Sequence, residues 1–176
     1  MSLKFSVILP IYNKVEYNTF KLSFDSLLNQ SLKPNEVIVI FDGPVKNEIK
    51  KYLNKKIKIY KFIRLVKYSK NRGLGIVLKK GTKLCKYPYI ARCDADDISL
   101  PNRFKLQIRF LRKNQNIDIL GSNISEIKKN KLISRKKVPK LHKDICSNIF
   151  IRNPINHSSV ILKKKAILNA GNYEDL

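Results

Sequence analysis

Three carboxylates crowd one short stretch, Asp94-Ala95-Asp96-Asp97, directly after the apolar run Tyr87 to Cys93. Residues i and i+2 of an extended segment point to the same side, so Asp94 and Asp96 can reach one ligand. Close carboxylates repel one another unless a cation neutralises them, and Mg²⁺ and Mn²⁺ prefer oxygen ligands. The spacing predicts that Asp96 binds the metal and that Asp94 contacts the ribose hydroxyls of a nucleotide. Helix capping is the alternative, but it explains one such carboxylate rather than three.

A fourth carboxylate, Asp42, ends a second apolar run, Glu36–Phe41, and is followed by Gly43. A carboxylate there can accept a hydrogen bond from an imide N–H such as N3 of uracil. The alternative is a turn-forming Asp-Gly pair. Ligands of open α/β sheets bind beyond the carboxyl ends of the strands, so we expect Asp42 beside the first cluster.

Four further residues are candidates for the same site, each with a structural alternative. Tyr12 could pack on a base and Asn13 could fix its loop, or both could simply end a strand. Arg72 could contact a phosphate or be one exposed basic residue among many. His157 could meet the metal, the diphosphate or the acceptor, or be a hydrogen-bonded structural histidine. The chain has no phosphate-loop or dinucleotide fingerprint, which argues against an ATPase or a dehydrogenase.

The elements expected to carry these residues alternate between strands and helices through the first half of the chain. This order predicts an α/β fold with a mostly parallel sheet and helices on both faces. The predicted strands are Phe5–Leu9 (closed by Pro10), Glu36–Phe41, Ile57–Val66 and Tyr89–Cys93. The predicted helices are Phe20–Leu28, Val45–Leu53 and Leu74–Cys85.

The second half is predicted to be more mixed. It should hold helices at Asn102–Asn114, His142–Phe150 and Lys164–Ala170, and strands at Ile117–Ile127, Lys131–Val138 and Ser159–Leu162. A polar turn at 128–130 should join the first two of those strands. We expect one domain over residues 1–176, with a nucleotide-binding half at 1–101 and the start of an acceptor-side half at 102–176.

The charge is extreme, with 37 Lys and Arg against 13 Asp and Glu and a formal net charge of +24. This positive charge has three possible interpretations: a solvated surface, attraction to an anionic membrane face, or binding of nucleic acid. The usual sequence motifs of nucleic-acid-binding proteins are missing. No apolar run approaches the roughly 20 residues that span a bilayer, and no secretory signal is evident, so we expect a cytoplasmic protein. Cys85, Cys93 and Cys146 are expected to be reduced core residues.

In order and combination, the motifs resemble those of family 2 glycosyltransferases with the GT-A fold, in the branch that builds bacterial surface polysaccharides. The segments that carry this resemblance are Val7–Asn13, Ser26–Ser31, Val39–Pro44, Asn71–Gly75, Ala91–Arg103 and Arg152–Val160.

The resemblance implies transfer of a sugar from a nucleotide-sugar, most often a UDP-sugar, to a glycan or lipid-linked acceptor. It implies a Mn²⁺ or Mg²⁺ ion and inversion at the anomeric carbon. By the same resemblance, Pro10 and Tyr12 line the nucleotide pocket, Asp42 contacts uracil, Asp94 contacts the ribose or sugar, and Asp96 ligates the metal. The parent enzyme would work at the inner face of the cell membrane.

The sequence departs from the family pattern at three places. Phe41 stands where many relatives have an acidic residue, and Leu78-Lys79 stand where many have Arg-Asn. Relatives usually continue into an acidic motif that carries the general base. We expect a C-terminally truncated core whose base lies beyond Leu176. The alternatives are an inactive domain that only binds nucleotide-sugar and, further away, a basic nucleic-acid-binding module.

Overall fold

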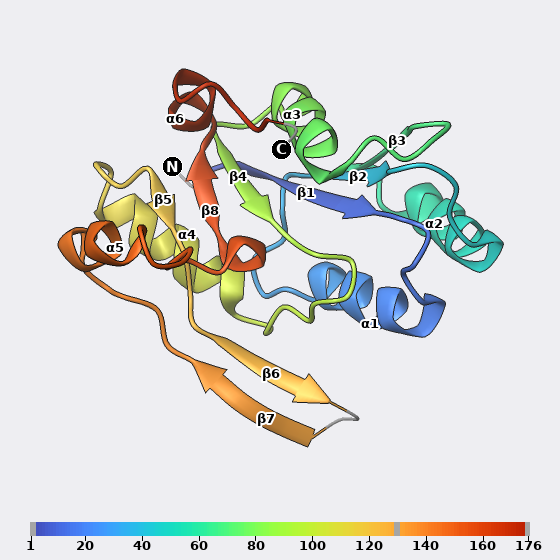
Figure 1. The fold of residues 1–176 in the computed structure, drawn as a ribbon. Coiled ribbons are helices and arrows are strands. Elements are labelled where there is room, and N and C mark those ends of the chain that lie inside the picture. The colour runs from blue at the N-terminus through green and yellow to red at the C-terminus, as the bar shows by residue number, and fades with distance from the viewer. Residues whose placement is uncertain (1–2, 129–130, 175–176) are drawn as a thin grey trace.

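The computed structural model describes residues 3–128 and 131–174 and contains a six-stranded sheet of order β3-β2-β1-β4-β8-β5 (Figure 1). Its strands are β1 (Phe5–Ile11), β2 (Glu36–Phe41), β3 (Ile63–Lys67), β4 (Tyr89–Arg92), β5 (Ile119–Leu120) and β8 (Ile161–Lys163). The first four in sequence pair in parallel, whereas β8 runs antiparallel to both β4 and β5. The expected mostly parallel α/β sheet is confirmed.

Helices cover both faces of this sheet, as the alternating pattern predicted (Figure 1). The side chains of α1 (Tyr17–Leu28), α2 (Asn47–Ile59) and α4 (Arg103–Lys113) pack into one core with alternate residues of β1, β2 and β4. On the other face, α3 (Leu74–Leu84) and α6 (Lys164–Asn169) pack on the remaining strand residues. Every residue of β1 and β2 is buried, which explains why these strands read as continuous apolar runs.

The first strand is longer than predicted, because it passes through Pro10 and ends at Ile11. Pairing between β1 and β4 ends at Ile8, which faces Arg92, while Pro10 still pairs with Ile40 of β2. Pro10 therefore lies beyond the β4 ladder, where its missing N–H costs no ladder hydrogen bond.

The predicted strand Ile57–Val66 is wrong in its first half, because α2 continues to Ile59 and β3 begins only at Ile63. The alternation of isoleucine and lysine suggested a strand. However, Ile57 packs against the core one turn after Leu53, and Lys56 reaches Asp25 on α1. These contacts recur at helical spacing and extend the helix.

The predicted strand Ile117–Ile127 is in fact two short strands, β5 and β6 (Ile124–Lys128). Residues 121–123 separate the two strands, and an added Cβ at Gly121 would lie 2.5 Å from Ile155. After this break, β6 pairs with β7 (Lys131–Lys136) in a separate hairpin that projects from the body of the molecule (Figure 1). The predicted turn 128–130 falls partly on residues 129–130, which lie outside the described residues.

The remaining boundaries differ by small shifts. The predicted helix ending at Phe150 is α5 (His142–Asn148), and the start of the predicted strand Ser159–Leu162 is a 3₁₀ turn, η1 (His157–Ser159), before β8. Cys85 and Cys93 are buried as expected, but Cys146 is exposed because it lies on the solvent side of α5.

Asp25 on α1 links α1 to α2 through Lys56 and Tyr52, and it also pairs with Lys21. Burial alone would raise the pKa of Asp25, but hydrogen bonds from these three partners lower it to about 2. A depressed carboxyl pKa stabilises the fold above the unfolded pKa of about 4 and loses that effect as pH falls towards 2.

We therefore expect Asp25 to contribute about 1–2 kcal/mol of stability at neutral pH that disappears between about pH 4 and pH 2. Urea unfolding of Asp25→Asn across this range should show a shallower loss of stability with acid than the parent chain. Glu48→Gln, at an exposed carboxylate in the first turn of α2, is the control and should keep the parent slope. Equal slopes for all three proteins would contradict the assignment.

Candidate functional site

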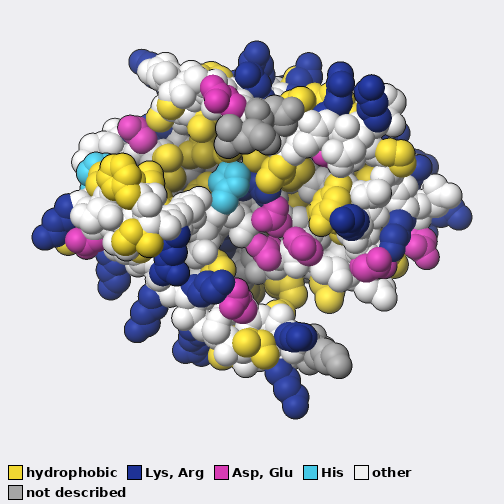
Figure 2. Space-filling model, in the orientation of Figure 1, with side chains coloured by type: hydrophobic (Ala, Val, Ile, Leu, Met, Phe, Trp, Pro, Cys, Tyr) yellow, Lys and Arg dark blue, Asp and Glu magenta, His cyan; other side chains and the backbone are white. Residues whose placement is uncertain are grey.

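A pocket of about 410 Å³ opens at the carboxyl ends of β1, β2 and β4. Figure 2 shows carboxylates gathered in the middle of this face, over the loop that follows β4, while most lysine and arginine side chains lie around the outline of the molecule. The lining residues are Pro10, Ile11, Tyr12, Val15, Asp42, Asn71, Gly73, Leu74, Asp94, Ala95 and Asp96. Three strands therefore bring the predicted acidic residues into one pocket.

Asp42 lies buried at the end of β2, with 6% of its surface exposed. Its backbone N–H donates to the carbonyl of Ile11 at 2.7 Å, which ties the end of β2 to that of β1. Its Oδ1 accepts a hydrogen bond from the backbone N–H of Arg72 at 2.6 Å. A carboxylate accepts at more than one lone pair, so Asp42 can also accept from a ligand in the pocket.

Gly43 is required where this loop closes. Its φ is +85°, and a Cβ there would lie 2.7 Å from the backbone nitrogen of Asn71. Both the left-handed conformation and the close approach exclude a side chain.

We expect Gly43→Ala to destabilise the chain by about 2–4 kcal/mol, from backbone strain together with the clash. Gly171→Ala is a matched control, because Gly171 has a φ of +94° and nothing within 4 Å of an added Cβ. The control should show the strain alone, about 1 kcal/mol. Urea midpoints measure both, and equal losses would show that the contact with Asn71 does not matter.

Asp94 is held by a buried arginine from its own strand. Arg92 is only 2% exposed, and its Nη2 forms an ion pair with Oδ1 of Asp94. Its Nη1 donates to the carbonyl of Cys93, and its Nε has no partner among the described residues. Arg92 was not predicted as a site residue. A signal was available in the sequence, because Arg92 is a lone charge inside the apolar run Tyr87 to Cys93.

Asp96 lies beside two other carboxylates at the mouth of the pocket. Desolvation and the like charges of Asp94 and Asp97 raise the pKa of Asp96. The described residues contain no ready-made group of three or more His, Cys, Asp or Glu metal ligands. Two carboxylates at one pocket wall still fit a hard divalent cation, because such ions complete their coordination with phosphate oxygens and water.

His157 in η1 does not line the pocket, and its Nε2 lies 2.9 Å from the hydroxyl of Tyr173. Burial and the nearby Arg92 lower the pKa of His157, although Asp94 opposes them. Both partners are partly buried, and the imidazole is kept mainly in its neutral form at pH 7. The predicted structural alternative, a hydrogen-bonded histidine, is the arrangement that the structure shows.

Two other predicted residues also lie outside the pocket lining. Asn13 is exposed beside Tyr12, and Arg72 contributes its backbone N–H to Asp42 while its side chain is exposed. In their place the same loop supplies Asn71, Gly73 and Leu74 to the wall. These three residues were not predicted as site residues, although they lie in a segment that carried the family resemblance, because sequence does not tell which side of a loop faces a ligand.

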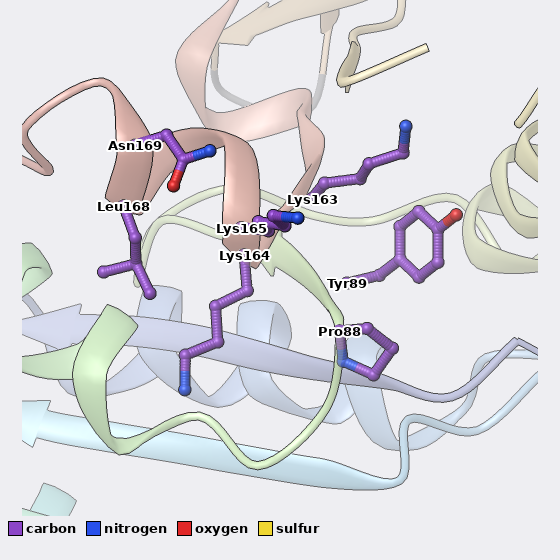
Figure 3. Close-up of a pocket in the computed structure, with 7 residues that line it drawn as sticks. All are labelled: Pro88, Tyr89, Lys163, Lys164, Lys165, Leu168 and Asn169. Carbon is purple, nitrogen blue, oxygen red and sulfur yellow. The ribbon is translucent and has the colours of Figure 1, made fainter. Parts of the chain in front are cut away.

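A second hollow of about 380 Å³ lies at the opposite end of β4 (Figure 3). It is lined by Pro88, Tyr89, Lys163, Lys164, Lys165, Leu168 and Asn169. The ammonium groups of Lys163 and Lys164 already bond to other parts of the chain, the first to Asp118 and the second to the carbonyl of Cys85. Among the residues that the structure describes, no Asp or Glu side chain lines this hollow, whereas Asp42, Asp94 and Asp96 all line the pocket at the carboxyl ends of the strands.

The sequence of this chain matches the model of Glycosyl transferase family 2 over residues 6–169. The chain belongs to this family. It is 34% identical over 176 residues to an uncharacterised glycosyltransferase of Haemophilus influenzae. It is 31% identical over 170 residues to the amylovoran biosynthesis glycosyltransferase AmsE of Erwinia amylovora. It is 33% identical over 178 residues to an Escherichia coli enzyme named UDP-Gal:alpha-D-GlcNAc-diphosphoundecaprenol beta-1,3-galactosyltransferase. The predicted family and its surface-polysaccharide branch are confirmed.

These alignments cover 99%, 97% and 97% of this family 2 chain, but only 66%, 64% and 62% of the relatives' own lengths. Among solved structures, S. aureus TarS in complex with UDP-GlcNAc superposes with a TM-score of 0.75 at 19% identity, over 98% of this chain and 49% of that one. A Pyrobaculum calidifontis mannosyltransferase in complex with GDP-Man and Mn²⁺ gives a TM-score of 0.70 at 14% identity, over 99% and 48%. This likeness confirms the GT-A fold. Within the described residues, no helix has the length and apolar character needed to cross a bilayer.

Proposed function

We propose that this domain binds a nucleotide-diphosphate sugar, specifically a UDP-sugar, and takes part in the transfer of the sugar to a glycan or lipid-linked acceptor. The observation that carries this proposal is that Asp42, Asp94 and Asp96 line one pocket at the carboxyl ends of three strands. Two similar proteins add support, since the Escherichia coli relative is named for a UDP-Gal donor and a diphosphoundecaprenol-linked acceptor, and the S. aureus TarS structure is a complex with UDP-GlcNAc.

Each pocket residue then has a proposed role. Pro10 and Tyr12 border the base, and Asp42 accepts the N3–H of uracil. Asp94, held by Arg92, accepts from the ribose hydroxyls. Asp96 is the proposed protein ligand of Mn²⁺ or Mg²⁺, which when bound supplies charge stabilisation to the departing diphosphate. The phosphate contact of Arg72 and the contacts of Asn13 and His157 stay predictions.

The proposed reaction is a displacement with inversion. An acceptor hydroxyl attacks the anomeric carbon, the bond from that carbon to the diphosphate oxygen breaks, and the hydroxyl proton passes to a general base. We propose that this base follows Leu176, since the relatives are longer than this chain. The domain would then bind the donor by itself, with transfer requiring further residues.

The test is calorimetric titration of UDP and of CDP into the chain, each with and without Mn²⁺. UDP should bind more tightly with Mn²⁺ than without it, and more tightly than CDP, because cytosine has no N3–H for Asp42 to accept. Absence of any Mn²⁺-dependent UDP binding would refute the proposal. Salt-sensitive binding of RNA or DNA in its place would favour the nucleic-acid alternative.

We also propose that the protein works in the cytoplasm at the inner face of the membrane. The segment around α5 exposes an apolar patch, with Phe150 93% and Ile151 81% exposed. Lysines and an arginine flank it in the sequence, and each basic residue near an anionic bilayer contributes about 1 kcal/mol. These residues are Lys137, Lys140, Lys143 and Arg152.

Sedimentation with phosphatidylglycerol vesicles tests this membrane contact. The chain should bind these vesicles but not neutral ones, and Phe150→Ser should weaken binding several-fold. Leu22→Ser, on an exposed apolar side chain of α1, is the control and should bind like the parent chain. If Phe150→Ser binds the vesicles as tightly as the parent chain, charge alone would explain the binding, and the proposed role of the apolar patch would be wrong.

A further inference from the structure

The loop that carries the carboxylates, residues 94–101 (here the acidic loop), has little regular structure of its own. Its internal backbone hydrogen bond from the N–H of Asp97 to the carbonyl of Asp94 is long, at 3.4 Å. It also holds three carboxylates within four residues, and their mutual repulsion favours spreading the loop apart. Something outside the loop must therefore fix its shape.

Three polar residues from α1 and the turn after it meet the acidic loop at both ends. Ser23 donates its hydroxyl hydrogen to the carbonyl of Asp94 at 2.9 Å. Ser26 accepts at its Oγ from the N–H of Ser99 at 2.9 Å. The segment containing Ser26 and Gln30 carried part of the family resemblance, but no role was predicted for these two residues.

Gln30 makes the largest set of these contacts. Its Nε2 donates to the carbonyl of Leu100 at 2.8 Å and to that of Ser99 at 3.2 Å. Its Oε1 accepts from the N–H of Phe104 at 3.2 Å, where α4 begins. One side chain thus ties the end of the acidic loop to the start of the next helix.

The burial of these side chains shows that they are not solvating groups. Ser23 is 0% exposed, on the face of α1 that also buries Phe20, Phe24 and Leu27. Gln30, just past the end of α1, is 1% exposed. A buried polar side chain costs free energy unless it is hydrogen-bonded, and an apolar one would pack here without that cost. The polar side chains differ from apolar ones in forming hydrogen bonds of defined direction to the backbone of the acidic loop.

We propose that Ser23, Ser26 and Gln30 are positioning residues that hold the acidic loop in the conformation that binds the metal and diphosphate. This inference rests on the proposed function. It predicts that removing these hydrogen bonds lowers the gain in UDP affinity that Mn²⁺ provides, without changing the contacts to the base. The base contacts come from the ends of β1 and β2, which these three residues do not touch, and the proposed ribose contact of Asp94 keeps its ion pair with Arg92.

The experiment is UDP titration with and without Mn²⁺ on Ser26→Ala, Ser26→Thr and the double variant Ser23→Ala/Ser26→Ala. The ratio of the two dissociation constants should fall about fivefold for Ser26→Ala and further for the double variant. Ser26→Thr keeps the hydroxyl at a half-buried position and should restore the ratio. Affinity without Mn²⁺ should change less than about twofold.

Thr82→Val is the matched control, because it removes a buried hydroxyl on α3 whose Oγ1 has no partner among the described residues. It should leave the ratio unchanged. If the parent chain shows no Mn²⁺-dependent gain, the proposed function fails. If the parent shows the gain and the serine variants retain it, or if they lose affinity equally with and without Mn²⁺, the positioning role is overturned.

Discussion

Replacing Asp96 by asparagine is expected to abolish the Mn²⁺-dependent part of UDP binding. Asn keeps the size and one oxygen but loses the charge that neutralises a divalent cation. Changes in residues that only support a ligand lower metal affinity 10- to 100-fold, so loss of the ligand itself should cost at least about 100-fold. Calorimetry at fixed ionic strength measures this directly.

Asp97→Asn is the control for Asp96→Asn, since it makes the same change of charge one residue away from the pocket lining. It should retain most of the Mn²⁺-dependent gain and should lower only the general attraction for cations. If the two variants behave alike, the metal contact would have to be shared or assigned to another carboxylate. If neither loses the gain, the metal assignment to Asp96 is wrong.

The second large effect concerns stability. Asp94→Ala removes a carboxylate from a cluster of three, so relief of repulsion alone would stabilise the chain. However, the change also leaves the guanidinium of Arg92, 2% exposed, without its ion-pair partner. Breaking a buried ion pair costs about 3–5 kcal/mol, and we expect about 2–3 because Asp94 itself is 38% exposed.

Two comparisons isolate this effect in urea unfolding. Asp97→Ala relieves repulsion without touching Arg92 and should leave stability nearly unchanged. The double variant Arg92→Met/Asp94→Ala removes both charges and should recover most of the loss. A double variant no more stable than Asp94→Ala would show that the packing of Arg92, and not its charge, stabilises this region.

The parts of the fold that sequence could predict are those where burial leaves a local pattern. Because β2 is covered on both faces, it reads as an apolar run from Val37 to Phe41. The end of α2 could not be predicted in this way. Its last turn alternates isoleucine and lysine, and the choice of helix depends on a contact of Lys56 with Asp25, 31 residues away.

The candidate site shows the same division. Asp42, Asp94 and Asp96 could be predicted because acidic residues at the ends of apolar strands are conspicuous in a basic chain. The hydrogen bond of His157 to Tyr173 could not, because it depends on how η1 and the segment after α6 are brought together. The partner of Arg92 is only two residues away, but its burial depends on β8 pairing with β4. Sequence identifies which residues carry charge, whereas topology decides which charges meet.

The position of β4 has a consequence for how this chain is made. Its two neighbours are β1, from the first residues, and β8, which ends at Lys163. While residues 1–101 alone have emerged from a ribosome, β4 is an edge strand with unpaired backbone groups on one side, a recognised aggregation hazard. The pairing of the strand that delivers the carboxylates is therefore completed only after β8 has been made.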